Sequence, residues 1–380
     1  MKKTYLLTPG PTPIPESVMS ALNRPILHHR TPAFQSIFEN VRQGLKSLYQ
    51  TKQEVIILTT TGTGAMEAAI TNLFSHGDTV ITINGGKFGE RWTKLARTFG
   101  LHPIEIQLPS GQSLDPQDLS HVIQEHPHAK AILFQASETS TGVSMPTQEI
   151  CKRAQAAGML SVCDAITACG VFDLPMDDWG IDVLITGSQK ALMIPPGLAM
   201  IGLSEKAWGA QQKSNLPKFY FDLARERKNQ IKNQTAWTPA ITLIVGLQES
   251  LRLIQEEGLH NVFKRHELLA RATRHAVSAL GLELLAKKHP STAVTAVLVP
   301  TSISDGKMIP KLMRDKYGVT IAGGQDELEG KIIRLSHFGY CDRFDILTAI
   351  SCLELTLHEL GHSIEFGKGV GAALKTFAEG

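Results

Sequence analysis

The fold class follows from one stretch, Val55-Ile56-Ile57-Leu58-Thr59-Thr60-Thr61-Gly62-Thr63-Gly64-Ala65, which joins an apolar run to a turn of threonine and glycine. Consecutive apolar residues of this kind are typical of a strand buried on both faces of a parallel sheet. The turn leads into a stretch that we expect to be helical from Ala65 to Phe74. A buried strand followed at once by a helix indicates an α/β domain.

Short β-rich runs recur along the chain, with helical sequence between them. This alternation predicts a doubly wound α/β domain with a mainly parallel sheet of seven strands. The last strand follows the previous one after only about ten residues, too few for a helical crossover, which favours an antiparallel orientation. The expected strands lie near residues 55–60, 79–84, 103–107, 130–135, 160–164, 182–187 and 198–203.

The pattern changes after the seventh strand. Residues 204–240 show no clear period and are expected to be irregular. The remaining sequence predicts a smaller α+β domain, and we place the domain boundaries so that a large domain covers residues 16–250 and a small one covers 251–380. The expected elements here are helices at 241–257, 266–280, 307–316 and 344–361 and strands near 293–299 and 331–336.

Composition excludes several classes of protein. The 380 residues include 38 basic and 36 acidic side chains, so the formal net charge of +2 gives no broad field to attract nucleic acid or an anionic membrane surface. No apolar run approaches the ~20 residues that a membrane span needs. The five cysteines form no CxxC pair and no cluster with histidine, so we expect reduced thiols, a cytoplasmic location and no metal site.

The turn at residues 59–65 is a candidate phosphate site. Glycines let the backbone approach a ligand closely, and free N–H groups at the start of a helix favour an anion. An ordinary strand-to-helix turn is the alternative interpretation. A dinucleotide site is excluded, because Glu67 replaces the third glycine of the GxGxxG pattern and the next strand ends in Asn84 instead of an acid.

Three charged residues lie at the ends of other strands or within one. Asp164 follows a buried strand, where its carboxylate would need a cation or several donors unless it caps a helix. Lys190 follows Gly187-Ser188-Gln189 among small and apolar residues, so burial would lower its pKa and favour the nucleophilic amine; a solvent-facing lysine is the alternative. Arg334 interrupts an apolar strand, where it could clamp a carboxylate or form an ion pair.

These four features correspond to the parts of one chemistry. A phosphate cup, a carboxylate and an amine match the 5′-phosphate, the pyridinium nitrogen and the aldehyde of pyridoxal phosphate, and a carboxylate clamp matches an amino acid substrate. None of the features is decisive alone. Together they predict pyridoxal 5′-phosphate as the cofactor.

The chain resembles the class V aminotransferases of the aspartate-aminotransferase fold, and among them the alanine–glyoxylate and serine–pyruvate aminotransferases. The matching motifs occur in the family's order over nearly the whole chain. They are Thr8-Pro9-Gly10-Pro11-Thr12-Pro13, His29-Arg30-Thr31-Pro32, the cup at 61–63, Ser137-Glu138-Thr139-Ser140-Thr141-Gly142, Asp164, Ser188-Gln189-Lys190-Ala191, Pro195-Pro196-Gly197 and Arg334.

The resemblance implies an enzyme of fold type I in which Lys190 binds the cofactor covalently and serves as acid and base, while Asp164 pairs with the pyridinium nitrogen. Arg334 and the backbone around Pro9 and Gly10 would bind the substrate carboxylate, which places residues 1–15 near the active site. The other implied cofactor-binding residues are Thr61, Gly62, Thr63 and Gln189 at the phosphate, Thr139 near the phenolic oxygen, Phe88 stacked on the ring, and Thr235 and Thr238 at the phosphate of a neighbouring subunit.

The resemblance also implies a transaminase that moves an amino group from alanine or serine to glyoxylate or pyruvate, in a homodimer with shared active sites. Aspartate, phosphoserine or an aminophosphonate is an alternative donor, for which Arg30 or residues 225–228 could supply a further cation. A cysteine desulfurase is disfavoured because Cys341 follows Arg334, whereas a desulfurase has its reactive cysteine before that arginine. A catalytically idle regulator or subunit of another complex is the alternative from a different class.

Overall fold

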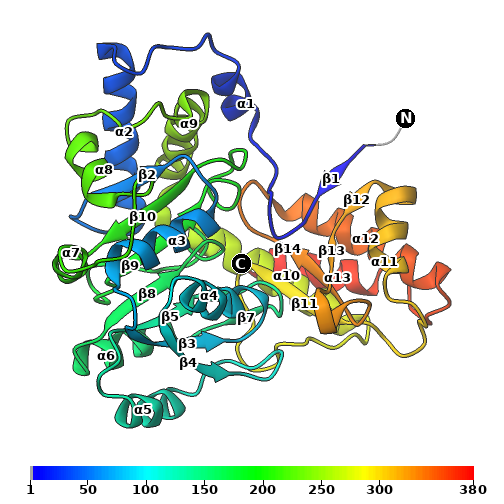
Figure 1. Ribbon diagram of the computed structural model, residues 1–380. Coiled ribbons are helices and arrows are strands. Elements are labelled where there is room, and N and C mark those ends of the chain that lie inside the picture. The colour runs from blue at the N-terminus through cyan, green and yellow to red at the C-terminus, as the bar shows by residue number, and fades with distance from the viewer. Residues whose placement is uncertain (1–2) are drawn as a thin grey trace.

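The computed structural model describes residues 3–380 and has a large lobe and a small lobe (Figure 1). The strands of the main sheet are β2 (Val55–Leu58), β3 (Thr79–Asn84), β4 (His102–Gln107), β5 (Ala131–Gln135), β8 (Leu160–Asp164), β9 (Val183–Gly187) and β10 (Ala199–Leu203). Their order across the sheet is β2-β10-β9-β8-β5-β3-β4. Each expected strand is present, which confirms the doubly wound α/β prediction.

Strand β10 is the one strand of the main sheet that runs against its neighbours. It pairs antiparallel with both β9 and β2, whereas the remaining pairs of this sheet are parallel. The short link between β9 and β10 leaves no room for a crossover helix. The antiparallel orientation favoured by the sequence is therefore confirmed.

Helices cover both faces of the main sheet (Figure 1). Ile57 packs into the core shared with α2 (Pro32–Tyr49) and α9 (Ile241–Glu257), whereas its neighbour Ile56 packs into the core shared with α3 (Gly62–Leu73). Because successive strand residues face opposite sides, a fully apolar strand stabilises both layers. The other helices of this lobe include α1 (Glu16–Leu22), α4 (Lys87–Thr98), α5 (Pro116–Glu125) and α6 (Thr147–Ala156).

The small lobe is an α+β unit, as predicted. Its sheet has the order β11-β14-β13, formed by Val294–Leu298, Ile332–Ser336 and Ala322–Gly323. The N-terminal strand β1 (Tyr5–Leu6) reaches this lobe and pairs parallel with β12 (Val319–Thr320). The helices of the lobe are α10 (Leu259–Ala279), α11 (Met308–Leu312), a π-helix (Met313–Tyr317), α12 (Arg343–Glu359) and α13 (Lys368–Glu379).

The expectation of an irregular segment at residues 204–240 is wrong for two helices, α7 (Glu205–Gln211) and α8 (Leu223–Gln230). Both begin at a side-chain cap: Ser204 accepts a hydrogen bond from the backbone N–H of Ala207, and Asp222 accepts one from Arg225. Such caps satisfy backbone donors that the first turn leaves free. The two caps stabilise helices that contain too few apolar residues to show a helical periodicity in the sequence.

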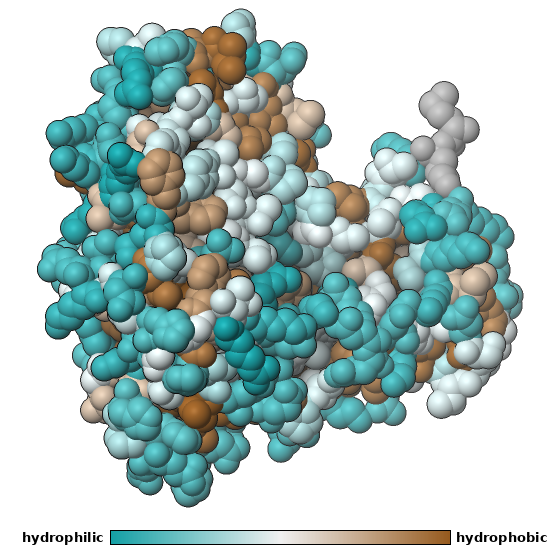
Figure 2. All heavy atoms as spheres, in the orientation of Figure 1, coloured by the Kyte–Doolittle hydropathy of each residue, from teal (hydrophilic) through white to brown (hydrophobic). Residues whose placement is uncertain are grey.

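The face shown in Figure 2 is mostly hydrophilic, with hydrophobic atoms gathered at the end of the large lobe that carries α1. Met19 of α1 is 52% exposed and Ile26 is 73% exposed. Within residues 3–380, no helix combines the length and the apolar character that crossing a bilayer requires.

Candidate active site

The loop after β9 buries Lys190 beneath the N-terminal segment. Lys190 is 8% exposed, and its Nζ donates a hydrogen bond to the carbonyl oxygen of Pro9. Gly10 lies against the same side chain: its φ is +102°, and a Cβ there would lie 2.5 Å from Nζ. Thr12 Oγ1 donates to the Lys190 carbonyl oxygen at 2.9 Å. Lys190 is therefore not a solvent-facing loop residue.

The environment of Lys190 favours its neutral form. The pKa of Lys190 is lowered to about 8, mainly by burial and with smaller contributions from Arg334 and Arg91, whereas Asp164 opposes the change. With that pKa, roughly a tenth of the amine is neutral at pH 7. The neutral amine is the form that attacks a carbonyl carbon.

Asp164 ends β8 and is 5% exposed. Its Oδ1 accepts a hydrogen bond from the backbone N–H of Ile166 at 2.8 Å, within a run of turns and not at the start of a helix. The pKa of Asp164 is raised to about 6, mainly by burial and with a smaller contribution from Glu138, whereas that hydrogen bond, Arg91 and Lys190 oppose the change. The carboxyl therefore favours a cationic ligand beside it.

Lys190 and Asp164 line one cavity at the carboxyl ends of β8 and β9, which we call the catalytic cavity. This is where open α/β sheets bind ligands. The cavity brings together most of the cofactor residues that the resemblance implied. Its other lining residues are Thr61, Gly62, Thr63, Phe88, Arg91, Ser137, Thr139, Ile166, Thr167 and Gln189.

The start of α3 provides free donors on one side of the catalytic cavity. The N-cap residue Thr61 makes no capping hydrogen bond with its side chain. At Gly62 a Cβ would collide with Cδ1 of Ile166, so a larger residue there would require that side chain to move. Across the cavity, Oε1 of Gln189 is buried and has no hydrogen-bond partner. Unused backbone donors at a helix start fit an anionic group, whereas the buried Oε1 of Gln189 is an acceptor that would need a donor.

Glu138 holds Phe88 in place and was not identified from the sequence. Its buried carboxylate accepts hydrogen bonds from the backbone N–H groups of Phe88 at 3.2 Å and Gly89 at 2.9 Å, and from Gln135 Nε2 at 3.1 Å. Burial raises the pKa of Glu138, while hydrogen bonds from Ser140, Gly89 and Phe88 lower it. The acid thus anchors the first turn of α4 beside the cavity. The one sequence signal that could have identified Glu138 is its position within the motif at 137–142.

Arg334 reaches this region from β14 of the small lobe. Its Nη1 donates to the carbonyl oxygen of Thr139 at 3.1 Å, and its Nε donates to that of Gly323 at 2.8 Å. It is 6% exposed, and burial lowers its pKa to about 10, against an opposing effect of Glu138. Thr139 Oγ1 lies 2.9 Å from Thr167 Oγ1. The guanidinium is held mainly by carbonyl oxygens, which leaves donors for a carboxylate.

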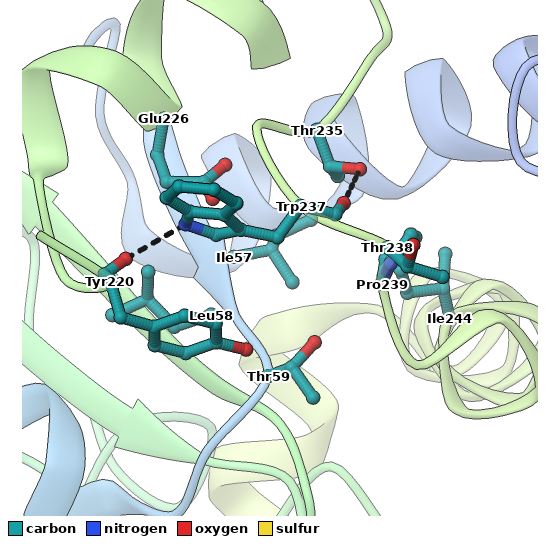
Figure 3. Close-up of a pocket in the computed structure, with 10 residues that line it drawn as sticks. All are labelled: Ile57, Leu58, Thr59, Tyr220, Glu226, Thr235, Trp237, Thr238, Pro239 and Ile244. Carbon is teal, nitrogen blue, oxygen red and sulfur yellow. Dashed lines mark hydrogen bonds between the residues drawn. The ribbon is translucent and has the colours of Figure 1, made fainter.

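Thr235 and Thr238 do not line the catalytic cavity. They line a separate pocket with Thr59, Tyr220 and Trp237, which we call the Thr238 pocket (Figure 3). Thr235 Oγ1 donates to the carbonyl oxygen of Trp237 at 2.6 Å, whereas Thr238 is exposed. Within one chain, the expected cofactor-binding residues therefore lie partly in the catalytic cavity and partly in the Thr238 pocket.

No reactive thiol lies at the catalytic cavity. Cys341, the candidate for a desulfurase nucleophile, is 5% exposed, and burial raises its pKa well above the usual value. A thiol in that state is a poor nucleophile. Across residues 3–380, no three His, Cys, Asp or Glu side chains come together in a way that could hold a metal ion.

The α/β fold, the buried lysine and carboxylate, and the helix start beside them define an aminotransferase of fold type I. The chain belongs to the aminotransferase class-V family, whose model matches residues 4–338. It is thus a transaminase of a family whose fold and chemistry imply pyridoxal phosphate.

Relatives with different names match the whole chain. The small subunit of the soluble hydrogenase of Synechococcus sp. (strain PCC 6716) is 43% identical, over 98% of this chain and 97% of its own. The L-aspartate–glyoxylate aminotransferase of Paracoccus denitrificans is 33% identical, over 98% and 96%. The serine–glyoxylate aminotransferase of Arabidopsis thaliana is 35% identical, over 97% and 94%. The crystal structure of pyridoxamine–pyruvate aminotransferase from Mesorhizobium loti has a TM-score of 0.95 at 28% identity, over 100% and 98%.

Proposed function

We propose that the chain transfers the amino group of alanine or serine to glyoxylate or pyruvate, with pyridoxal 5′-phosphate bound at Lys190. The observation that carries the proposal is the single cavity in which Lys190 and Asp164 lie beside the start of α3. The names of the Arabidopsis and Mesorhizobium proteins support a small amino acid and a small 2-oxo acid.

The residues present fit this cofactor. Thr61, Gly62 and Thr63 would surround the phosphate, and Gln189 would donate to it through its amide nitrogen. Asp164 would hold a proton on the ring nitrogen, because a buried carboxylate is stabilised by a cation next to it. Phe88 would stack on the ring, and Thr139 would lie near its phenolic oxygen. When bound, the cofactor supplies an aldehyde carbon that bonds to amines and a ring that withdraws electrons.

Lys190 would move the proton between substrate and cofactor. An amine with a pKa of about 8 can accept the proton from the substrate Cα and release it again near neutral pH. Pro9 and Gly10 contact the side chain and exclude water from it, and Thr12 holds the backbone of Lys190. Lys190 thus combines covalent attachment of the cofactor with general acid and base catalysis.

Arg334 would bind the substrate carboxylate. Its Nε and one Nη1 donor are used by carbonyl oxygens, so Nη2 and the remaining Nη1 donor can form a two-point contact. The backbone around Pro9 and Gly10 would border the same site. A clamp at this position orients the Cα proton towards Lys190.

The Thr238 pocket would act in a homodimer with shared active sites. Thr238 is exposed, whereas the hydroxyl of Thr235 is already bonded to Trp237, so Thr238 is the better candidate for a neighbouring subunit's phosphate. Phe219 beside this pocket is 72% exposed, which suits a surface covered by another chain.

A subunit role in a larger complex is the second candidate function, favoured by the name of the Synechococcus relative. A transamination screen separates the two. The purified chain with pyridoxal phosphate should convert alanine or serine with glyoxylate or pyruvate, and aspartate is included because of the Paracoccus relative. Turnover with aspartate alone would redirect the substrate assignment. The absence of turnover with every pair, in protein that binds the cofactor, would favour the subunit role.

A further inference from the structure

Arg91 lies at the phosphate side of the catalytic cavity without a role assigned to it. It is on α4, one turn after Phe88, and it lines the cavity. Its Nη1 donates to Thr63 Oγ1 at 3.0 Å, and its guanidinium carbon lies 5.1 Å from the centroid of the Phe88 ring. Arg91 therefore bridges the two helices that begin beside the cavity.

Arg91 differs from the other charges of α4 because it has no carboxylate partner among residues 3–380. Glu90, the adjacent acid, pairs with Lys94 at 2.7 Å and Lys87 at 3.8 Å. Lys87 also pairs with Asp326 at 2.7 Å, and Arg97 pairs with Glu105 at 3.4 Å. A guanidinium has five N–H donors, and here a threonine hydroxyl is its one hydrogen-bond acceptor. An anion is the ligand that this arrangement lacks.

The charge at the phosphate side supports the same conclusion. A phosphate monoester carries about two negative charges near neutral pH. The start of α3 supplies roughly half a positive charge, and Thr61, Thr63 and Gln189 are neutral. Arg91 already acts on the cavity, since its charge lowers the pKa of both Asp164 and Lys190.

We propose that Arg91 binds the 5′-phosphate of the cofactor, either directly or by fixing the Thr63 hydroxyl towards it. The assignment rests on the proposed function, because it requires pyridoxal phosphate in this cavity. Arginine suits the task since its planar donors match phosphate oxygens. Stacking over Phe88 would keep the guanidinium in position when the cofactor is absent.

The test compares Arg91→Gln with Arg97→Gln, which removes the same charge from the same helix two turns further on. Cofactor-free proteins are titrated with pyridoxal 5′-phosphate and, separately, with pyridoxal, and binding is followed by absorbance and by borohydride trapping. Loss of a charged hydrogen bond should weaken pyridoxal phosphate binding by about 10- to 100-fold in Arg91→Gln. Pyridoxal binding in Arg91→Gln should fall much less than pyridoxal phosphate binding, and both affinities in Arg97→Gln should stay unchanged.

Further outcomes separate the assignment from the proposed function. Arg91→Lys should recover part of the affinity because it keeps the charge, and it replaces Arg91→Gln as the test if that variant does not fold. An equal loss of affinity for both aldehydes, or no loss for either, would overturn the role of Arg91 alone. If the wild-type chain binds neither aldehyde, the proposed function fails as well.

Discussion

The catalytic cavity and the Thr238 pocket both contain residues expected to bind the cofactor, the second for a neighbouring subunit, and the chain builds them very differently. The first lies at the ends of β8 and β9, and both Asp164 and Lys190 are less than 9% exposed. The second is lined by residues of β2, α8 and α9 and of the loop that carries Thr238, which is exposed (Figure 3). The comparison shows that the edge of a sheet can bring reactive groups together within one chain, whereas Thr238 lies apart from those groups on the same chain.

We expect the largest effect from removing the Asp164 carboxylate from the catalytic cavity. Asp164→Asn keeps the shape but removes the charge that would face the ring nitrogen, and losing one partner of a buried ion pair costs about 3–5 kcal/mol. We expect kcat to fall roughly 10²- to 10⁴-fold. Steady-state transamination with cofactor in excess measures this.

Asp182→Asn is the matched control for that variant. Asp182 is also buried, but it precedes β9 at the opposite end of the sheet, where its Oδ2 accepts from the backbone N–H of Ser161 at 3.0 Å. The control should affect stability and leave kcat near the wild-type value. A similar fall in kcat for both variants would contradict a catalytic role for Asp164.

The next effect concerns the burial of Lys190. Because the pKa of Lys190 falls from 10.5 to about 8 on folding, the unfolded chain keeps the proton over this range while the folded chain loses it. The free energy of unfolding of the cofactor-free protein should therefore rise with pH, by about 3 kcal/mol relative to Lys190→Met. Urea denaturation between pH 7.5 and 10.5 measures the difference, and parallel curves for the two proteins would contradict it.

A smaller effect is expected in the Thr238 pocket. If this loop completes the site of a partner, Thr238→Val should weaken pyridoxal phosphate binding about 10-fold, the value of one hydrogen bond to a charged group. Thr242→Val is the control, because Thr242 is exposed in the first turn of α9 only four residues away. Equal affinities in both variants would mean that the Thr238 pocket does not serve the cofactor.

The smallest effect lies outside both pockets. The salt bridge between Lys87 and Asp326, at 2.7 Å, joins α4 to the loop before β14 and so links Phe88 to the lobe that carries Arg334. Exposed pairs contribute little, so Lys87→Met should change the KM for the amino donor by less than about threefold. Lys307→Met, which breaks an exposed pair with Glu329, is the control. A tenfold change would show that the lobes depend on this contact.

The sheet and the catalytic cavity could be predicted largely because both follow from local sequence. Runs such as Val55–Leu58 are apolar enough to require burial on both faces, and the polar residues that follow such strands must meet at one edge. Asp164 and Lys190 were found in that way.

Other residues act through contacts that local sequence does not reveal. The role of Glu138 depends on meeting the backbone of Phe88 some fifty positions away. Arg91 could have been noticed, since it lies one helical turn from Phe88, but its lack of an acid partner appears only in three dimensions. Helix α8 was not predicted from the sequence because it is largely polar and its start depends on the cap at Asp222.

The proposed function depends most directly on a covalent bond between the cofactor and Lys190. Borohydride treatment of the protein loaded with pyridoxal 5′-phosphate, followed by peptide mass mapping, identifies the modified lysine. The account predicts a single stoichiometric pyridoxyl label on the peptide that contains Lys190. A label on another lysine, or none on protein that still catalyses transamination, would contradict it.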